Sequence, residues 1–438
     1  MKDKFIKSTI ILIIGGLITK ILSLVIRIIT TRYIGTYGIG LFMMIMPTFS
    51  LFITICTLSL PLAISKLISE NKRNNKKIIF GITPFAIIFD IFIMVILIII
   101  SPFISNNLLS NSDLYYPILC ISFTLPFITL SCIARGYFFG KERMLPHTIS
   151  NLFEQIVRII ITILITPYLL KYGIIVTICG LVLYNVISEI ASILILFLFL
   201  PKKVTIKKSD IVIDPHDMKD LMSISIPTTA GRLISSISMF LEPIIITFVL
   251  LKLGYDNNYI IHEYGIITGY VIPMVTLPCF LSSAVSNALL PTLTKLNELK
   301  DYKGIKRKIK QAIIFSLFIG GCCSIVLILF PSEIMNLIFN ESLGIDYLIF
   351  ATFIFLISYI GGPLSTALQA MNKSKNVMYS NLFSNIIKNV ILFILLFLDI
   401  NMYALLIAYL FQFLFITIYQ YLVIKQDLSK IHLDFSGK

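Results

Sequence analysis

The sequence predicts an all-α polytopic membrane protein of about 12 transmembrane helices, arranged as two pseudo-symmetric six-helix bundles. Its composition, its series of long apolar stretches and an internal repeat together predict this fold. Of the 438 residues, 57% are hydrophobic and only 13% are charged. Soluble globular chains carry roughly 25% charged residues, so this chain could not cover itself with a water-facing surface. The composition therefore excludes soluble enzymes, secreted disulfide scaffolds and nucleic-acid binders.

The apolar stretches are long enough to cross a bilayer as helices, because one span needs roughly 20 residues. They are too long and too uniformly apolar for outer-membrane strands, which alternate and run about ten residues. Twelve spans are predicted, at about 8–30, 38–64, 78–104, 114–135, 148–169, 174–200, 221–250, 264–292, 309–330, 346–370, 376–398 and 402–424.

An internal repeat divides these spans into two sets of six. The segment Ser-Asn-Leu-Phe at 150–153 recurs at 380–383, and Pro61 recurs as Pro291, in both cases 230 residues later. Since six is even, both halves start on the same side of the membrane, as in transporters built from parallel repeats. We expect an N-terminal six-helix bundle at 1–200, a cytoplasmic linker at 201–220, and at 221–438 a C-terminal six-helix bundle with a short cytoplasmic tail.

The distribution of basic residues predicts the orientation. With the N-terminus inside, the inside segments carry 28 of the 36 Lys and Arg residues, whereas the outside loops carry only Arg32, Lys171 and Lys252. Cytoplasmic loops are the basic ones in inner-membrane proteins. We therefore expect a multi-pass protein of the bacterial cytoplasmic (inner) membrane with both termini in the cytoplasm.

Nine ionisable residues lie inside the predicted spans. A charge at the bilayer centre costs at least about 2.5–3.5 kcal/mol, so such residues normally face a water-filled cavity or a partner of opposite charge. The basic residues are Lys20, Arg27, Arg158, Arg232 and Lys388, and the acidic residues are Asp90, Glu154, Glu189 and Glu242.

Four of the basic residues are predicted to lie at one depth. Lys20, Arg158, Arg232 and Lys388 each follow the cytoplasmic end of a span by about 10–12 residues, or roughly 15–18 Å, near the bilayer midplane. The repeat pairs Lys20 with Arg232 and Arg158 with Lys388, and we expect Lys20 and Arg232 to face each other across the cleft between the halves. Such a set favours an anion, for example a pyrophosphate. Arg27, nearer the outer end, is a fifth candidate for substrate binding.

Each charged candidate also has a structural interpretation. Glu154 and Arg158 are four residues apart in the favourable order for a salt bridge on one helix face. Glu242, which precedes a proline, is either a coupling carboxylate or the partner of a basic residue. Asp90 and Glu189 are expected to be counter-ions within the first half.

Motifs for catalysis and for bound cofactors are absent from the sequence. The chain has no G-x-x-x-x-G-K-[ST] phosphate loop, and its seven cysteines and four histidines form no metal-binding pattern. We expect no cofactor, no metal and no enzymatic activity. Transport would then draw on an ion gradient, the membrane potential or the substrate concentration.

Five short segments together are characteristic: Gly-Thr-Tyr-Gly-Ile-Gly-Leu-Phe at 35–42, Leu-Pro-Leu-Ala-Ile-Ser-Lys-Leu at 60–67, Arg-Gly-Tyr-Phe-Phe-Gly at 135–140, Glu-Gln-Ile-Val-Arg at 154–158 and Leu-Glu-Pro at 241–243. In these segments the chain resembles the stage V sporulation protein B family, a branch of the multidrug/oligosaccharidyl-lipid/polysaccharide exporter superfamily. The resemblance implies two six-helix bundles around a central cavity. It also implies movement of a lipid-linked cell-wall precursor, in spore formers for cortex peptidoglycan.

The resemblance also implies roles for individual residues and partners. Related lipid II flippases line the cavity with arginines, and Lys20 sits where their first-span arginine sits. They also carry arginines on span 8, where this sequence has no basic residue before Lys295. The implied partners are a lipid-linked anionic oligosaccharide, the lipid bilayer and cell-wall synthases, with no nucleic acid.

Two other functions remain open from the sequence. One is a cation-coupled multidrug exporter of the same fold, for which an acid-rich cavity would be expected. The other is a non-transporting scaffold that recruits a cell-wall synthase. The cations at the midplane favour an anionic substrate over the cationic drugs of a multidrug exporter, because cationic drugs would be repelled there.

The orientation can be tested by labelling single cysteines from outside the cell in a cysteine-free background. We expect labelling near Asn107, Asn258 and Glu341 and no labelling near Lys76, Asp210 or Lys303. Reversal at either set would overturn the charge-based orientation.

Overall fold

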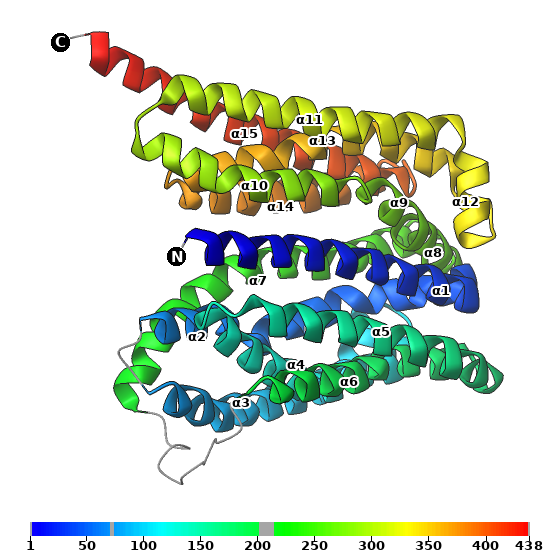
Figure 1. Ribbon diagram of the computed structural model, residues 1–438. Helices are drawn as coiled ribbons and strands as arrows, with labels where there is room; N and C mark the ends of the chain where they lie inside the picture. The colour runs from blue at the N-terminus through cyan, green and yellow to red at the C-terminus, as the bar shows by residue number, and fades with distance from the viewer. Residues whose placement is uncertain (1, 71–73, 201–213, 437–438) are drawn as a thin grey trace. The chain divides into compact units, whose positions relative to one another are not determined.

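The computed structural model describes residues 2–70, 74–200 and 214–436 (Figure 1). Every regular element in these ranges is a helix, as the sequence predicts. Most of the predicted linker, at 201–213, lies outside the described residues.

The first half begins with a long broken helix. Its main helices are α1 (Lys2–Thr57), α2 (Leu60–Ser69), α3 (Asn75–Phe103), α4 (Tyr115–Gly140), α5 (Met144–Leu169) and α6 (Ile174–Leu198). Short turns follow α3 and α5: η1 (Ile104–Leu108), η2 (Ser112–Leu114) and η3 (Leu170–Tyr172). Within α1, Gly35 has φ 65° and ψ −174°, a conformation that essentially only glycine adopts. This break separates the first predicted span from the second.

The second half contains more interruptions. Its elements are α7 (Pro215–Lys252), α8 (Asn257–Gly265), η5 (Ile266–Val271), α9 (Ile272–Thr276), α10 (Cys279–Glu298), α11 (Tyr302–Leu329), α12 (Pro331–Phe339), α13 (Ile345–Ala370), α14 (Ser374–Phe397) and α15 (Tyr403–Ser436). The predicted span 264–292 is divided among α8, η5, α9 and α10. Pro273 lies in the first turn of α9 and Pro278 is the N-cap of α10, where a residue without an amide proton is tolerated.

Ten helices within the described ranges are long and apolar enough to cross a membrane. The prediction of about 12 spans agrees with this number for two reasons. One long segment, Ile14–Ser69, holds the first two predicted spans, and the eighth is the interrupted one described above. The chain is therefore a multi-pass, all-helical membrane protein.

The internal repeat is visible in the helix boundaries. Helix α4 ends at Gly140 and α13 at Ala370, 230 residues apart, and α5 and α14 begin at Met144 and Ser374 with the same offset. The packing repeats as well: α4 packs against α2, α3 and α6, and α13 packs against α10, α11 and α15. The two halves thus use one helix arrangement twice.

Close packing between α2 and α4 requires glycine. A Cβ atom at Gly136 would lie 3.0 Å from the Cα of Pro61, and one at Gly140 would lie 2.9 Å from the carbonyl oxygen of Ser65. Small residues of this kind let membrane helices approach closely. They fix α4, which carries the central basic residue of the site described below.

By its contacts the chain forms two compact units, Met1–Thr247 and Phe248–Lys438, with the boundary inside α7. Within the first unit, α7 joins α1 through a 2.9 Å hydrogen bond between the hydroxyls of Ser236 and Thr54. A second hydrogen bond, 3.2 Å long, joins Thr229 to Ser59, just before α2. The predicted division at 201–220 follows the sequence repeat and stays a prediction.

Candidate functional site

A cluster of buried charges joins α4, α5 and α6 in the first unit. Arg135 on α4 places Nη2 2.6 Å from Oε2 of Glu154 and 3.0 Å from Oε2 of Glu189. Arg158, one turn after Glu154 on α5, places Nη2 2.8 Å from Oε1 of the same carboxylate. Two guanidinium groups therefore balance two carboxylates.

Serine hydroxyls on α6 complete the cluster. Ser192 Oγ lies 3.1 Å from Nη2 of Arg135, and Ser188 Oγ lies 3.0 Å from Nη2 of Arg158. The exposed fraction of the four charged side chains is only 8–20%. Charges so far from water are tolerated only when paired and hydrogen-bonded. The salt bridge that the sequence suggests between Glu154 and Arg158 is thus present in the structure. Glu189 joins the same cluster as the second counter-ion of Arg135.

Arg135 is absent from the sequence-based candidates because the predicted span 114–135 ends at it, which places it at the start of the cytoplasmic loop. The structure instead extends α4 to Gly140, so that Arg135 lies inside the helix. Charge balance was the signal that could have identified it. Glu154 and Glu189 are two buried acids, and Arg158 alone neutralises one of them.

A cavity of about 340 Å³ lies beside this cluster, between α1, α5 and α6. Two guanidinium groups, those of Arg27 and Arg158, line it, and none of its lining residues is acidic. Further polar lining comes from Ser23, Thr30, Thr162, Tyr184 and Asn185. The cavity thus presents positive charge and hydroxyl groups to whatever enters it.

Arg27 differs from Arg158 in its surroundings. Its Nη2 lies 2.8 Å from the sulfur of Met43, and no carboxylate in the described part of the chain forms a salt bridge with it. Arg27 and Thr30 share a stripe of α1 with Ser23 and Lys20, since residues three or four apart lie on one helix face. Lys20 is exposed, and Ser23 Oγ lies 3.2 Å from Oε1 of Gln155 on α5.

The remaining basic candidates lie elsewhere. Arg232 on α7 is exposed, and both Arg232 and Arg135 lie near Cys132 of α4. That Lys20 and Arg232 face each other stays a prediction. Lys388 belongs to the second unit, where it is buried on α14 with Nζ 5.2 Å from the ring centroid of Tyr409.

Two acidic candidates stand apart from the cluster. Glu242 on α7 is buried. Asp90 on α3 is fully buried, and its carboxylate lies beside the thiol of Cys56 and the hydroxyl of Thr129. No Lys or Arg in those ranges forms a salt bridge with Asp90, so the structure does not place it as a counter-ion.

A metal site is not formed by the residues that the structure describes, since no group of three or more His, Cys, Asp or Glu side chains gathers there. Long apolar helices, a repeated six-helix arrangement and buried charges around a cavity together define a membrane transporter. Comparison with known proteins identifies which kind.

The family described as polysaccharide biosynthesis protein matches residues 5–297, and the family described as MatE matches 263–395. Stage V sporulation protein B of Bacillus subtilis (strain 168) is 33% identical over 392 residues, which cover 87% of this chain and 76% of that protein. The chain therefore belongs to the polysaccharide biosynthesis protein family, in the stage V sporulation protein B branch.

Two solved structures share the fold. An inward-facing multidrug resistance MATE family transporter matches with a TM-score of 0.73 and 15% identity, covering 94% of this chain and 95% of that one. Lipid II flippase MurJ in an inward closed conformation matches with a TM-score of 0.71 and 19% identity, covering 96% and 89%. The chain therefore has the fold of membrane flippases and exporters, and its family and relatives are described by membrane transport and polysaccharide biosynthesis rather than by an enzyme activity.

The ion cluster predicts a specific effect on stability. Glu154→Gln removes the carboxylate shared by Arg135 and Arg158, and breaking a buried ion pair in this way costs about 3–5 kcal/mol. We expect a clearly lower midpoint when thermal unfolding of a fluorescent-protein fusion in detergent is followed by size-exclusion chromatography.

Arg27→Gln is the matched control, because it removes a half-buried cation that has no carboxylate partner among the described residues. We expect its midpoint to stay close to that of the unmodified protein. Equal decreases of the unfolding midpoint in the two variants would contradict a stabilising role of the ion cluster.

Proposed function

We propose that the protein is a flippase that moves a lipid-linked anionic oligosaccharide across the cytoplasmic membrane by alternating access. Its substrate would be a peptidoglycan precursor, used in spore cortex synthesis. The observation that carries this proposal is the cavity lined by Arg27 and Arg158 and by no acidic residue.

The electrostatics of the cavity favour a pyrophosphate group. Guanidinium groups bind phosphate oxygens in pairs, and the attraction is strengthened where water is excluded. Arg158 already donates to Glu154 and Ser188, so its position is fixed before a ligand arrives. Arg27 keeps its charge uncompensated by any described carboxylate, which leaves it for the substrate.

The polar stripe of α1 offers a path for the headgroup. Lys20, Ser23, Arg27 and Thr30 succeed one another at helical spacing, from an exposed lysine to a cavity-lining threonine. The charged headgroup would pass from residue to residue along this stripe. The polyprenyl tail would remain in the bilayer, where its apolar surface stays out of water.

The alternatives fit these surroundings less well. A cationic drug would be repelled by Arg27 and Arg158, which disfavours a multidrug exporter of the same fold. A scaffold would gain nothing from a half-buried, uncompensated Arg27, since removing a charge from water is costly. Cell-wall synthases are the proposed partners, because they would consume the precursor delivered outside.

We further propose that Asp90 takes part in coupling to an ion gradient. Its carboxylate lies in the interior beside the neutral side chains of Thr129 and Cys56, with no described salt-bridge partner, and a buried charge without an opposite charge is strongly disfavoured. A proton or a small cation would neutralise it. Loss of that ion would then favour a different packing of α3 against α4.

The substrate hypothesis is tested in a sporulating deletion strain by measuring lipid-linked precursor on each side of the membrane. We expect Lys20→Gln and Arg232→Gln to lower transport without loss of protein from the membrane, because no described carboxylate is left unpaired. Lys20→Glu and Arg232→Glu should be worse, since a carboxylate repels pyrophosphate at low dielectric.

Lys171→Gln, outside the spans, is the control and should complement fully. Full complementation of cortex formation by both glutamate variants would sink the anion-site hypothesis. Failure of the glutamine variants to accumulate would instead assign Lys20 and Arg232 to structure.

Coupling is tested in proteoliposomes with an imposed proton or sodium gradient. We expect the gradient to accelerate transport by the unmodified protein but not by Asp90→Asn, which keeps the shape of the side chain and removes its charge. Asp113→Asn, at a partly exposed acid in η2, should respond like the unmodified protein. An undiminished response in Asp90→Asn would contradict the coupling role.

A further inference from the structure

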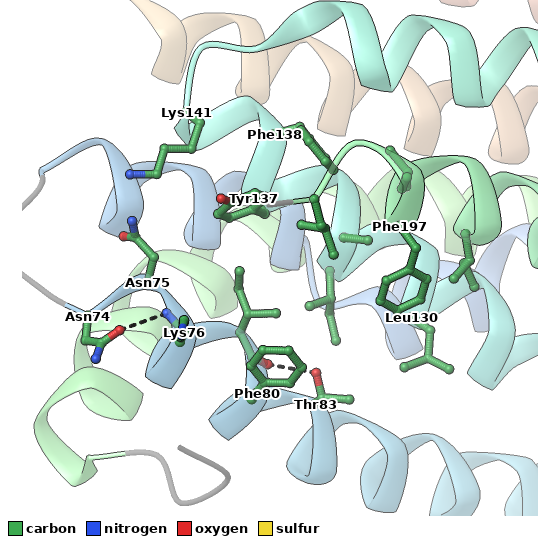
Figure 2. A pocket seen from close by; sticks show the side chains of 16 residues that line it. Asn74, Asn75, Lys76, Phe80, Thr83, Leu130, Tyr137, Phe138, Lys141 and Phe197 are labelled. Carbon is green, nitrogen blue, oxygen red and sulfur yellow. Dashed lines mark hydrogen bonds between the residues drawn. The ribbon is translucent and has the colours of Figure 1, made fainter. Parts of the chain in front are cut away.

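Each unit contains a groove that is separate from the cationic cavity. In the first unit a groove of about 590 Å³ is formed by α3, α4 and α6 (Figure 2). In the second unit a groove of about 680 Å³ is formed by α11, α13 and α15. Neither groove shares a lining residue with the cavity that contains Arg27.

The two grooves occupy equivalent positions in the repeat. Lys76, Ile79 and Ala134 line the first, and the residues 230 positions later, Lys306, Ile309 and Leu364, line the second. The helices that form the grooves also correspond, because α3, α4 and α6 hold the third, fourth and sixth predicted spans of the first half, and α11, α13 and α15 hold those of the second. A groove that appears twice is a property of the repeated fold.

The first groove is polar at one end and apolar at the other. Figure 2 shows Asn75 and Lys141 gathered at one end, while Leu130 and Phe197 lie at the other. The Oδ1 atom of Asn75 is buried without a hydrogen-bond partner in the described ranges.

The second groove has the same character with more charge. Lys303, Lys306 and Lys310 are three and four residues apart and so share one face of α11, and Lys425 is contributed by α15. None of the four forms a salt bridge within the described residues. The apolar part of the lining consists of Ile309, Ile313, Ile314, Leu364 and Ile424.

The ligand that fits both ends of such a groove is amphipathic and anionic. The charge distribution assigns the lysine-bearing ends to the cytoplasmic side, where the membrane surface carries anionic lipids. Basic pockets between membrane helices on that side hold acidic lipid headgroups, and the apolar walls suit an acyl chain. No acidic residue lines either groove to oppose a phosphate.

We propose that both grooves bind an anionic phospholipid of the cytoplasmic leaflet. Its headgroup phosphate lies against Lys141 and Lys76 in the first groove and against the four lysines in the second, with an acyl chain along the apolar walls. The inference depends on the charge-based orientation and is independent of the transported substrate.

The proposal is tested by native mass spectrometry of the full chain titrated with phosphatidylglycerol and, separately, with phosphatidylcholine. We expect tighter binding of phosphatidylglycerol. The double variant Lys306→Gln, Lys310→Gln should weaken it by about fivefold for each lysine removed, with phosphatidylcholine binding unchanged.

The matched control is Arg307→Gln, Lys308→Gln, which makes the same change of charge on the same turns of α11 at residues that do not line the groove. Its affinity should stay within about twofold of the unmodified chain. For the first groove the test variant is the single substitution Lys141→Gln, and its control is the single substitution Arg143→Gln.

A second measurement on the unmodified chain does not depend on the folding of variants. Phosphatidylglycerol with a photoactivatable acyl chain should label peptides containing 130–138 or 309–314. The proposal would be overturned if phosphatidylglycerol and phosphatidylcholine bound equally well. It would also be overturned if the control variants lost as much phosphatidylglycerol affinity as the groove variants, or if only other peptides were labelled. Displacement of phosphatidylglycerol by an equimolar polyprenyl phosphate would overturn it too, because this would assign the grooves to the tail of the substrate.

Discussion

The buried salt bridges among Arg135, Glu154, Arg158 and Glu189 organise the first unit. They join three helices, α4, α5 and α6, at residues that would be costly to bury singly. They also fix the position of Arg158, which forms a salt bridge with Glu154 and lines the cavity beside α1. The position of one charge that lines the cavity therefore follows from the requirement that the others be neutralised.

The cavity draws its character from the difference between two arginines. Arg158 is compensated by a carboxylate that does not line the cavity, whereas Arg27 meets a methionine sulfur and no described acid. A fully balanced site would have little attraction for an anion, and a site of bare cations would strain the fold. One anchored and one uncompensated guanidinium satisfy both needs, which is consistent with a site that binds and releases its ligand.

Local patterns in the sequence predicted the helices and the repeat, because apolar length and spacing depend on neighbouring residues. The pairing of Glu154 with Arg158 was predictable for the same reason, since the two lie one turn apart. The role of Arg135 was not, because it depends on where α4 ends and on Glu189, which is 54 residues away. The isolation of Asp90 likewise could not be predicted, since a sequence does not show which charges fail to meet.

At the positions equivalent to the buried ion cluster, the second unit has different partners. The positions 230 residues after Arg135 and Glu154 are Ser365 and Ser384. There Ser365 donates to Gln420 at 3.0 Å and Gln420 donates to Ser380 at 2.9 Å, so neutral hydrogen bonds join α13, α14 and α15. Lys388, which corresponds to Arg158, packs against an aromatic ring instead. At these equivalent positions the helix packing is thus supported by ion pairs in the first half and by neutral hydrogen bonds in the second, so the two arginines that line the cavity belong to the N-terminal unit.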